Sequence, residues 1–403
     1  MPLAVFVLGL SIFALGTSEF MITGLLPGMA ADLGVSIPDA GLLISAFAVG
    51  MVVGAPLLAV GTLKLPRRTT LLALLVVFAG SHVAGALAPG YGLLFATRVV
   101  SALACAGFWA VAAATTVSLV PAARRGRALA VLVGGLTVAN IAGVPAGTFL
   151  GQHAGWRTAF WAVAALTVLA VAGVLAFVPR TGTGTGDSPA LRVRTELRVF
   201  RSGRFWLALG VIALTQAMVF AAFSYLAPLL TTTDGVNSSW VPLVLVLFGA
   251  GALVGILAGG RFADAHPFAT LYGSLGLAVA ALVTLALTSH ATVAVVAVLV
   301  LGAAAFAANP ALNVRAYTVA GGSSPLVGAS TTSGFNVGNT AGPWLGGVAL
   351  NAGLGFPSVA WVGAVLGGLA LAAVTFALRL QRSDDARAAV RGSARSPETA
   401  AAR

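Results

Sequence analysis

Cysteine and lysine are almost absent from this chain of 403 residues, and acidic side chains are few. Cys105 is the only cysteine, so an intrachain disulfide is excluded, and one cysteine with four scattered histidines gives no cluster of metal ligands. The only lysine, Lys64, follows Leu63, whereas a phosphate-binding P-loop requires a lysine directly after a glycine. An ATP-driven pump is therefore excluded, and we expect neither a metal nor a cofactor.

Charge of either sign is also scarce, and apolar side chains dominate instead. Only 8% of the residues are charged and 59% are hydrophobic, whereas a soluble domain carries roughly 25% charged residues. The mean hydropathy of +1.01 agrees with an integral membrane protein. Apolar runs long enough to cross a bilayer as helices occur twelve times. They lie at approximately 4–27, 38–61, 69–88, 91–118, 127–150, 157–178, 205–231, 240–260, 268–289, 292–314, 325–350 and 358–379.

The basic residues lie between the apolar runs rather than on a soluble face. The pI of about 11.5 could suggest a nucleic-acid partner, but nucleic-acid binders gather Lys and Arg on one soluble surface. If both termini are cytoplasmic, 20 of the 22 basic residues lie in cytoplasmic segments, and the exceptions are Arg98 and Arg157. The positive-inside rule thus predicts a multi-pass protein of the cell membrane, with both termini cytoplasmic and no nucleic acid bound.

The chain divides into two similar halves. We expect bundles of six helices at 1–179 and 205–380, a cytoplasmic linker at 180–204, and a disordered cytoplasmic tail at 381–403. Asn140-Ile-Ala-Gly143 in the first half matches Asn339-Thr-Ala-Gly342 in the second at an offset of 199. A parallel duplication of six-helix halves predicts an all-α membrane protein with the major facilitator fold, twelve helices in two pseudo-symmetric bundles. Such a chain can enclose a cavity alone, so we expect a monomer.

Two formal charges lie deep within the predicted spans. Glu19 is the one carboxylate in a stretch that is otherwise uncharged from Met1 to Ala31, and Arg98 lies in the fourth span. Each is seven or eight residues from the outer end of its span, which places both at a depth of roughly 10–12 Å. A charge in hydrocarbon is costly, so an ionisable residue at this depth indicates a functional site.

Two interpretations of Glu19 and Arg98 remain open. Burial favours the neutral form of a carboxyl group, whereas a nearby cation favours the charged form, so the two together could bind and release a proton. The alternative is a fixed structural ion pair.

Further polar and aromatic side chains recur at helical spacing within the spans. Candidates for a substrate cavity are Thr23, Trp109, Gln216, Phe220, Tyr225, Asn309, Asn313 and Asn336. An apolar pocket with a few polar groups suits a drug-sized molecule. The alternatives are hydrogen bonds between helices and aromatic packing against lipid. In the fifth span, Gly143, Pro145 and Gly147 predict close helix packing and a bend. We place His82 and His290 near outer helix ends as uncharged residues outside the site.

Several segments together resemble one known family. They are Gly16-Thr-Ser-Glu19-Phe-Met-Ile-Thr-Gly24-Leu-Leu-Pro27, the helix-4 Arg98, and Gly143-Val-Pro145-Ala-Gly147 with Gly155-Trp156-Arg157. Nearly the whole chain is similar to the chloramphenicol-resistance exporters of actinomycetes, which belong to the twelve-helix drug:proton antiporters of the major facilitator superfamily. The resemblance implies export of chloramphenicol by alternating access driven by proton entry. It also assigns proton and substrate coupling to Glu19 and Arg98, and an exporter motif to Gly143, Pro145 and Gly147.

The chain departs from the family pattern after the second helix. The family motif there is Gly-x-x-x-Asp-Arg, but this chain has Gly61-Thr-Leu-Lys64-Leu-Pro66 and lacks the aspartate. The counterpart in the second half keeps it as Gly260-Arg-Phe-Ala-Asp264, so Asp264 joins Gly143, Pro145 and Gly147 as a structural or gating candidate. Relatives that export sugars or purine nucleosides share the helix-1 segment, so these substrates, and a broader range of drugs, remain alternatives.

Other classes of function fit the sequence less well. The spans contain no nucleophile beside a base and no paired carboxylates, so we expect no enzyme. A receptor would need a soluble output domain, which the short polar segments do not provide. Without the resemblance, a proton-coupled importer or a passive facilitator would be equally consistent with the residues.

Overall fold

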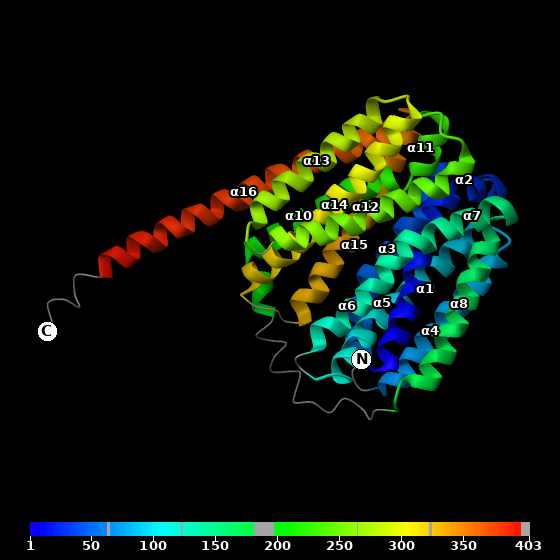
Figure 1. Ribbon diagram of the computed structural model, residues 1–403, viewed down its shortest axis with the longest axis horizontal. Coiled ribbons are helices and arrows are strands. Elements are labelled where there is room, and N and C mark those ends of the chain that lie inside the picture. Colours follow the sequence, from blue (N-terminus) through cyan, green and yellow to red (C-terminus); the bar gives the residue numbers. More distant parts are fainter. Residues whose placement is uncertain (63–64, 122–123, 181–196, 264, 322–324, 396–403) are drawn as a thin grey trace.

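The computed structural model describes residues 1–62, 65–121, 124–180, 197–263, 265–321 and 325–395, and all regular elements in these ranges are helices (Figure 1). The first half contains α1 (Leu3–Phe20), α2 (Ile22–Leu33), α3 (Ile37–Gly61), α4 (Arg67–Ala86), α5 (Tyr91–Ser118), α6 (Arg125–Val138), η2 (Ala139–Gly143), α7 (Val144–Ala154) and α8 (Trp156–Phe177). The second half contains η3 (Leu197–Arg201), α10 (Gly203–Phe223), α11 (Leu226–Thr232), η4 (Ser238–Trp240), α12 (Val241–Ala263), α13 (Pro267–Leu287), α14 (Ala291–Ala320), α15 (Pro325–Asn351) and α16 (Pro357–Arg395).

The predicted spans correspond to these helices. Within the described residues, eleven helical segments are long and apolar enough to cross a membrane. The twelfth span is α15, whose 27 residues are long enough but include many polar and small side chains. Large apolar side chains on many helices, such as Leu57, Leu169 and Val254, are more than half exposed, as expected for surfaces that face lipid.

Helix breaks recur at matching places in the two halves. The first span is divided at Met21, six residues before Pro27, and the seventh is divided at Ser224 and Tyr225, shortly before Pro228. Proline has no N–H and its ring clashes with the carbonyl four residues earlier, so the break at Ser224 lies where Pro228 would strain a continuous helix. Pro27 is accommodated inside α2, after the break at Met21. In the fifth span the π-helix η2 ends two residues before Pro145, at the position of the predicted bend. The wider π-helical turn likewise relieves the strain that a proline causes in a helix.

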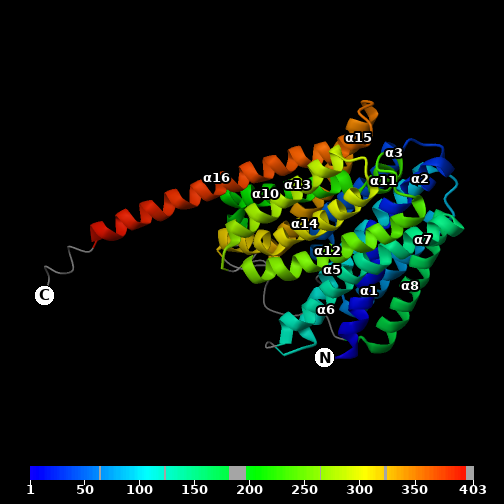
Figure 2. The same ribbon diagram turned by 45° about the horizontal axis from the view of Figure 1, so that its top comes forward.

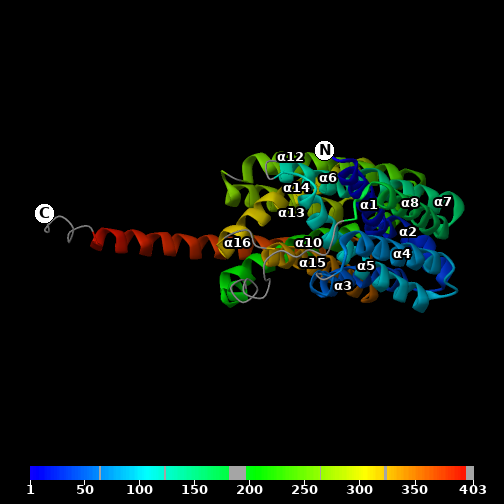
Figure 3. The same ribbon diagram turned by 90° about the horizontal axis from the view of Figure 1, so that it is seen from below.

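The helices form two bundles joined near one end. We call the end that carries the N-terminus and Arg67, Arg124 and Arg204 the basic end, and the other the neutral end. The bundles meet where α3 packs on α15, α2 on α11, and α7 and η2 on α12. Their basic ends lie apart in Figures 1 and 2, and Figure 3 shows the halves from below. Two hydrogen bonds join the bundles within the described residues, from Ser45 Oγ to the Thr340 carbonyl (3.0 Å) and from Gln152 Nε2 to the Ser238 carbonyl (2.9 Å).

The expected disordered tail is wrong over most of its length. We expected the last helix to end near residue 380, whereas α16 continues to Arg395 and extends beyond the bundle (Figure 1). The reason is that a helix already formed in the membrane needs no new nucleus, and the following segment is rich in the helix formers Ala and Arg. The predicted linker at 180–204 is described only from 197, where it forms η3 and the start of α10, and Asp264 lies outside the described residues.

Candidate functional site

The last turn of α1 carries the predicted carboxylate. Ser18 is fully buried and Glu19 is 9% exposed, and the helix break at Met21 follows directly. Main-chain acceptors in a last helical turn lose their intrahelical partners, so other groups can bind there. Within the described residues, the Glu19 carboxylate has no hydrogen bond and no ion pair within 4 Å. It is therefore a buried acid with no fixed partner.

Arg98, 1% exposed, is held by Ser18 rather than by Glu19. Its Nη1 donates to Ser18 Oγ (2.9 Å) and its Nη2 donates to the Ser18 carbonyl (3.1 Å). The guanidinium carbon lies 4.4 Å from the centre of the Phe47 ring, and Nε has no hydrogen-bond partner. The structure thus places the cation beside the residue that precedes Glu19, without the direct ion pair that was one of the two interpretations.

His82 belongs to the same cluster, although its sequence position near an outer helix end led us to leave it out. The side chain is 1% exposed on α4, with Nε2 at 2.6 Å from Ser18 Oγ and Nδ1 at 2.8 Å from the Phe78 carbonyl. A carbonyl only accepts hydrogen bonds, so Nδ1 carries the proton and Nε2 accepts from the Ser18 hydroxyl. The same hydroxyl oxygen then accepts from Arg98.

These bonds give the cluster one direction. Arg98 donates to Ser18, Ser18 donates to His82, and His82 donates to the Phe78 carbonyl. Three helices, α1, α4 and α5, are held together through one hydroxyl group. These bonds hold the guanidinium at a defined place beside the residue that precedes Glu19.

His82 variants are expected to separate this positioning role from simple packing. Replacing His82 with Leu leaves the Ser18 hydroxyl without an acceptor, and an unmade buried hydrogen bond costs about 1–3 kcal/mol. We expect His82→Leu to lower transport roughly tenfold, whereas His82→Gln, whose Oε1 can accept from Ser18, retains most of the activity. Initial transport rates at equal protein levels test this, and equal rates for the two variants would contradict it.

Asparagine side chains of the second half present unpartnered acceptors. Asn313 Nδ2 donates to the Asn309 carbonyl (2.9 Å) and Asn336 Nδ2 to the Thr332 carbonyl (3.1 Å), so both amides bond to their own helix. The Oδ1 atoms of Asn309, Asn336 and Asn339 are buried and accept no hydrogen bond from the described residues. Leaving such atoms unpaired is costly, so each of them is available to accept a hydrogen bond from a group outside the described residues.

The other candidate residues lie on several different helices. Phe220, on α10, lies 5.5 Å from Phe20 of α1 between ring centres, and Gln216, 8% exposed, is one turn away. The fully buried Tyr225 donates from its hydroxyl to the Pro343 carbonyl (2.9 Å), so it ties the break between α10 and α11 to α15. Thr23 is 1% exposed on α2. Trp109, half-buried on α5, is eleven residues beyond Arg98, about 16 Å along the helix, so the structure does not bring it to Arg98.

The glycines of the fifth span lie against the first span. A Cβ on Gly143 would be 2.0 Å from Thr17 Oγ1, and one on Gly147 would be 3.3 Å from Met21 Cβ. At Gly143 only glycine permits this approach, whereas at Gly147 a side chain would require a small shift of Met21. Pro145 lines an open cavity of about 860 Å³ between α7 and α12.

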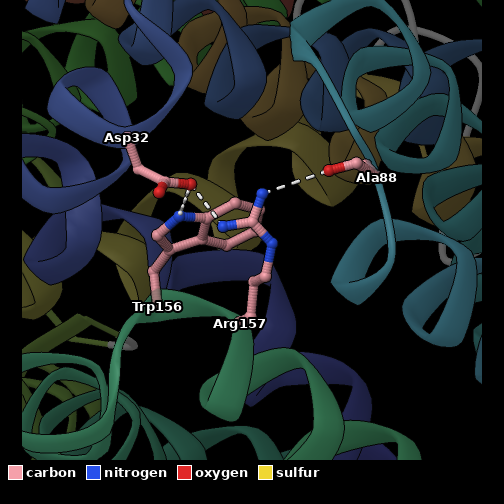
Figure 4. Close-up of polar contacts among 4 residues, drawn as sticks. All are labelled: Asp32, Ala88, Trp156 and Arg157. Atoms are coloured by element: carbon pink, nitrogen blue, oxygen red, sulfur yellow. Dashed lines mark hydrogen bonds and ion pairs between the residues drawn. The ribbon is translucent and has the colours of Figure 1, made fainter.

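A separate polar cluster ties together the neutral end of the first bundle (Figure 4). Asp32 forms an ion pair with Arg157, whose Nη2 also donates to the Ala88 carbonyl (3.2 Å), and Trp156 Nε1 donates to Asp32 Oδ2 (3.0 Å). Hydrogen bonds from Arg157 and Trp156 hold the pKa of Asp32 below its usual value. The sequence drew attention to Trp156 and Arg157 but not to their acidic partner.

The Asp32 pair is expected to contribute stability that depends on pH. A carboxyl group with a lowered pKa stabilises the fold above its usual pKa and loses this contribution as the pH falls through the lowered value. We expect Asp32→Asn to cost at most about 1 kcal/mol at pH 7, since both side chains are partly exposed, and the difference to vanish well below pH ~4. Thermal unfolding of both proteins across this range measures it. A difference that persists at low pH would contradict the assignment to charge.

Comparisons with known proteins decide the family. The model of the Major Facilitator Superfamily matches residues 8–329. The chain belongs to this superfamily. A chloramphenicol resistance protein of Streptomyces lividans is 42% identical over 375 residues, which cover 92% of this chain and 95% of that protein. The inner membrane transport protein YdhP of Escherichia coli strain K12 is 36% identical over 375 residues, with 93% and 95% covered.

Solved structures agree with the fold. A D-xylose-proton symporter matches with a TM-score of 0.75 at 16% identity, covering 93% of this chain and 96% of that one. At this identity the likeness concerns the fold alone. As a member of the Major Facilitator Superfamily, this protein is a multi-pass membrane transporter of small molecules and not an enzyme.

Proposed function

We propose that this transporter exports chloramphenicol from the cytoplasm in exchange for protons. The observation that carries the proposal is Glu19, a buried carboxylate without a fixed partner, next to a serine that holds a buried arginine. Intramembrane carboxylates mark ion pathways. The name of the 42% identical Streptomyces lividans relative supports the substrate.

The coupling uses one proton site. Protonated Glu19 carries no charge and its carboxylate carries one, so the two states interact differently with the cation that Ser18 and His82 hold in place. A ligand shifts a conformational equilibrium only through such a difference, and the proton supplies it. One proton moving inward down about 100 mV and one pH unit releases roughly 3.7 kcal/mol, enough to hold a drug gradient of a few hundredfold.

The substrate part of the site lies in the second half. Chloramphenicol carries hydroxyl groups and an amide N–H. These groups can donate hydrogen bonds to the unpartnered amide oxygens of Asn309, Asn336 and Asn339. Its aromatic ring suits the apolar surroundings that Phe220 provides beside Phe20. Proton and drug thus bind to different halves, and movement of the halves against each other couples them.

The remaining proposals concern orientation, gating and assembly. The basic end faces the cytoplasm, as the positive-inside rule requires, so the hydrogen bonds that join the bundles near the neutral end close the outer side. Gly143 and Gly147 provide the close contact of the fifth span with the first, Pro145 contributes its bend, and Asp264 contributes to gating. The transporter acts as a monomer.

Asn336→Leu is expected to weaken the drug site selectively. Leucine has a similar shape but lacks the acceptor, and loss of one hydrogen bond of about 1.4 kcal/mol raises KM for chloramphenicol about tenfold. Thr215→Val is the matched control, because Thr215 is equally buried and its hydroxyl bonds to the Val211 carbonyl of its own helix (2.8 Å). Initial rates over a range of drug concentrations measure both. Equal KM values for the two variants would contradict the assignment.

Drug accumulation in cells tests the proposed function as a whole. Cells that express the wild type should accumulate less chloramphenicol than cells without the protein, and an uncoupler that collapses the proton gradient should remove the difference. Wild-type accumulation equal to that of empty cells, with the protein inserted, would overturn chloramphenicol as the substrate and favour sugars or nucleosides. A difference that survives uncoupling would overturn the coupling to protons.

A further inference from the structure

A second cavity lies at the basic end of the C-terminal bundle, away from Glu19 and Arg98. It has a volume of about 280 Å³ and lies between the ends of α10, α14 and α16. Its polar lining includes Arg204, Arg315 and Gln381, and none of its lining residues is acidic. The export mechanism uses none of these groups.

Arg315 is the unusual member of this lining. Its side chain is half-buried, its guanidinium carbon lies 3.9 Å from the centre of the Phe268 ring, and Nη1 donates to Gln381 Oε1 at 3.3 Å. Within the described residues no carboxylate lies within 4 Å of it. A partly desolvated cation without a negative partner is costly, so the cavity favours an anion.

Apart from Thr318, the rest of the cavity lining is apolar. Val211, Leu312 and Val374, one from each helix, are all buried residues of the core and line the same space. Arg315 is five residues from the end of α14, about 8 Å along the helix axis, so the arginines lie near the membrane boundary. The cavity therefore combines a cationic rim with an apolar wall at the depth where lipid headgroups meet acyl chains.

We propose that this cavity binds an anionic phospholipid of the leaflet at the basic end. The phosphate lies between Arg204 and Arg315, and the glycerol and first methylene groups lie against the apolar wall. Basic pockets between transmembrane helices are the known means of holding such headgroups. Free inorganic phosphate carries the same negative charge but has no apolar part. A comparison of its binding with that of the lipid therefore distinguishes the two ligands.

Lipid binding to the purified full-length protein tests the proposal without requiring transport. Phosphatidylglycerol is titrated in a neutral detergent, with binding followed by native mass spectrometry and by the midpoint of thermal unfolding. Arg315→Gln should weaken binding at least tenfold. Arg261→Gln is the matched control, because it removes one exposed arginine of the same end that does not line the cavity. Phosphatidylcholine and inorganic phosphate at equal concentrations should raise the midpoint much less.

A second variant keeps the test decisive if Arg315→Gln folds poorly. Ala377 lines the cavity and is 7% exposed, so Ala377→Leu reduces the space without removing a charge and should also weaken phosphatidylglycerol binding. Equal affinities of the wild type and both cavity variants would overturn the proposal. Arginine-dependent binding of inorganic phosphate as tight as that of the lipid would overturn the lipid as the ligand.

Discussion

Glu19→Gln is expected to abolish the concentrative export of chloramphenicol while leaving drug binding nearly intact. Glutamine has the shape of a protonated glutamate but cannot release a proton, so the cycle loses its only coupled ion. The drug gradient that cells maintain should fall from up to a few hundredfold to about one. The measurement is steady-state accumulation in cells that express equal amounts of inserted wild type and variant.

The matched control for this change is Asp39→Asn. Asp39 is an exposed carboxylate at the neutral end, where its Oδ2 accepts from Ser36 Oγ (2.6 Å), so the substitution removes the same charge outside the membrane core. Export should remain close to the wild-type level. Retention of a wild-type gradient by Glu19→Gln would contradict the assignment of proton coupling to this residue.

Arg98→Lys is expected to lower the transport rate by tenfold or more although the charge is kept. The guanidinium reaches two acceptors of Ser18 at once and lies over the Phe47 ring, and an ammonium group cannot reproduce this planar two-point contact. Loss of a buried charged hydrogen bond costs about 1.5–3 kcal/mol, or roughly 10- to 150-fold if it acts on the transport step. Initial rates at saturating drug measure the effect.

The control for Arg98→Lys is Arg157→Lys. Arg157 also binds two acceptors and lies over an aromatic ring, but at the exposed neutral end. Its replacement should lower thermal stability slightly and leave the rate unchanged. If the two variants lose activity equally, general destabilisation explains the loss and the positioning role of Arg98 is wrong.

Much of the fold could be predicted because the bilayer imposes strong rules. Span lengths, basic loops and the repeated Asn-x-Ala-Gly segments predicted the helices and the two bundles. The end of α16 could not be predicted in the same way, because a rise in charge indicates the membrane boundary but not the end of a helix. Only an explicit estimate of helix propensity from Arg382 to Arg395 would have indicated the extension.

The site was predictable in part. Glu19 and Arg98 were noticed because both are charged and lie at similar depth in the first and fourth spans. Depth does not determine how a helix is rotated about its axis. The sequence could therefore not distinguish an ion pair between the two from the observed contacts of Arg98 with Ser18. His82 is four residues from the end of α4, about 6 Å deep, which is shallower than the roughly 10–12 Å expected for Glu19 and Arg98, so depth alone did not place it in the site. Whether asparagines bond across helices or to their own helix depends on side-chain rotamers, which a sequence pattern does not contain.

Proton movement driven by the drug itself tests the central claim most directly. Purified protein is reconstituted into vesicles that enclose a pH-sensitive dye, and chloramphenicol is added outside without any starting pH gradient. The account predicts that drug entry drives protons out, so the interior becomes alkaline with the wild type and stays unchanged with Glu19→Gln. Entry of chloramphenicol through the wild type without proton movement, or with protons moving in the same direction, would contradict it.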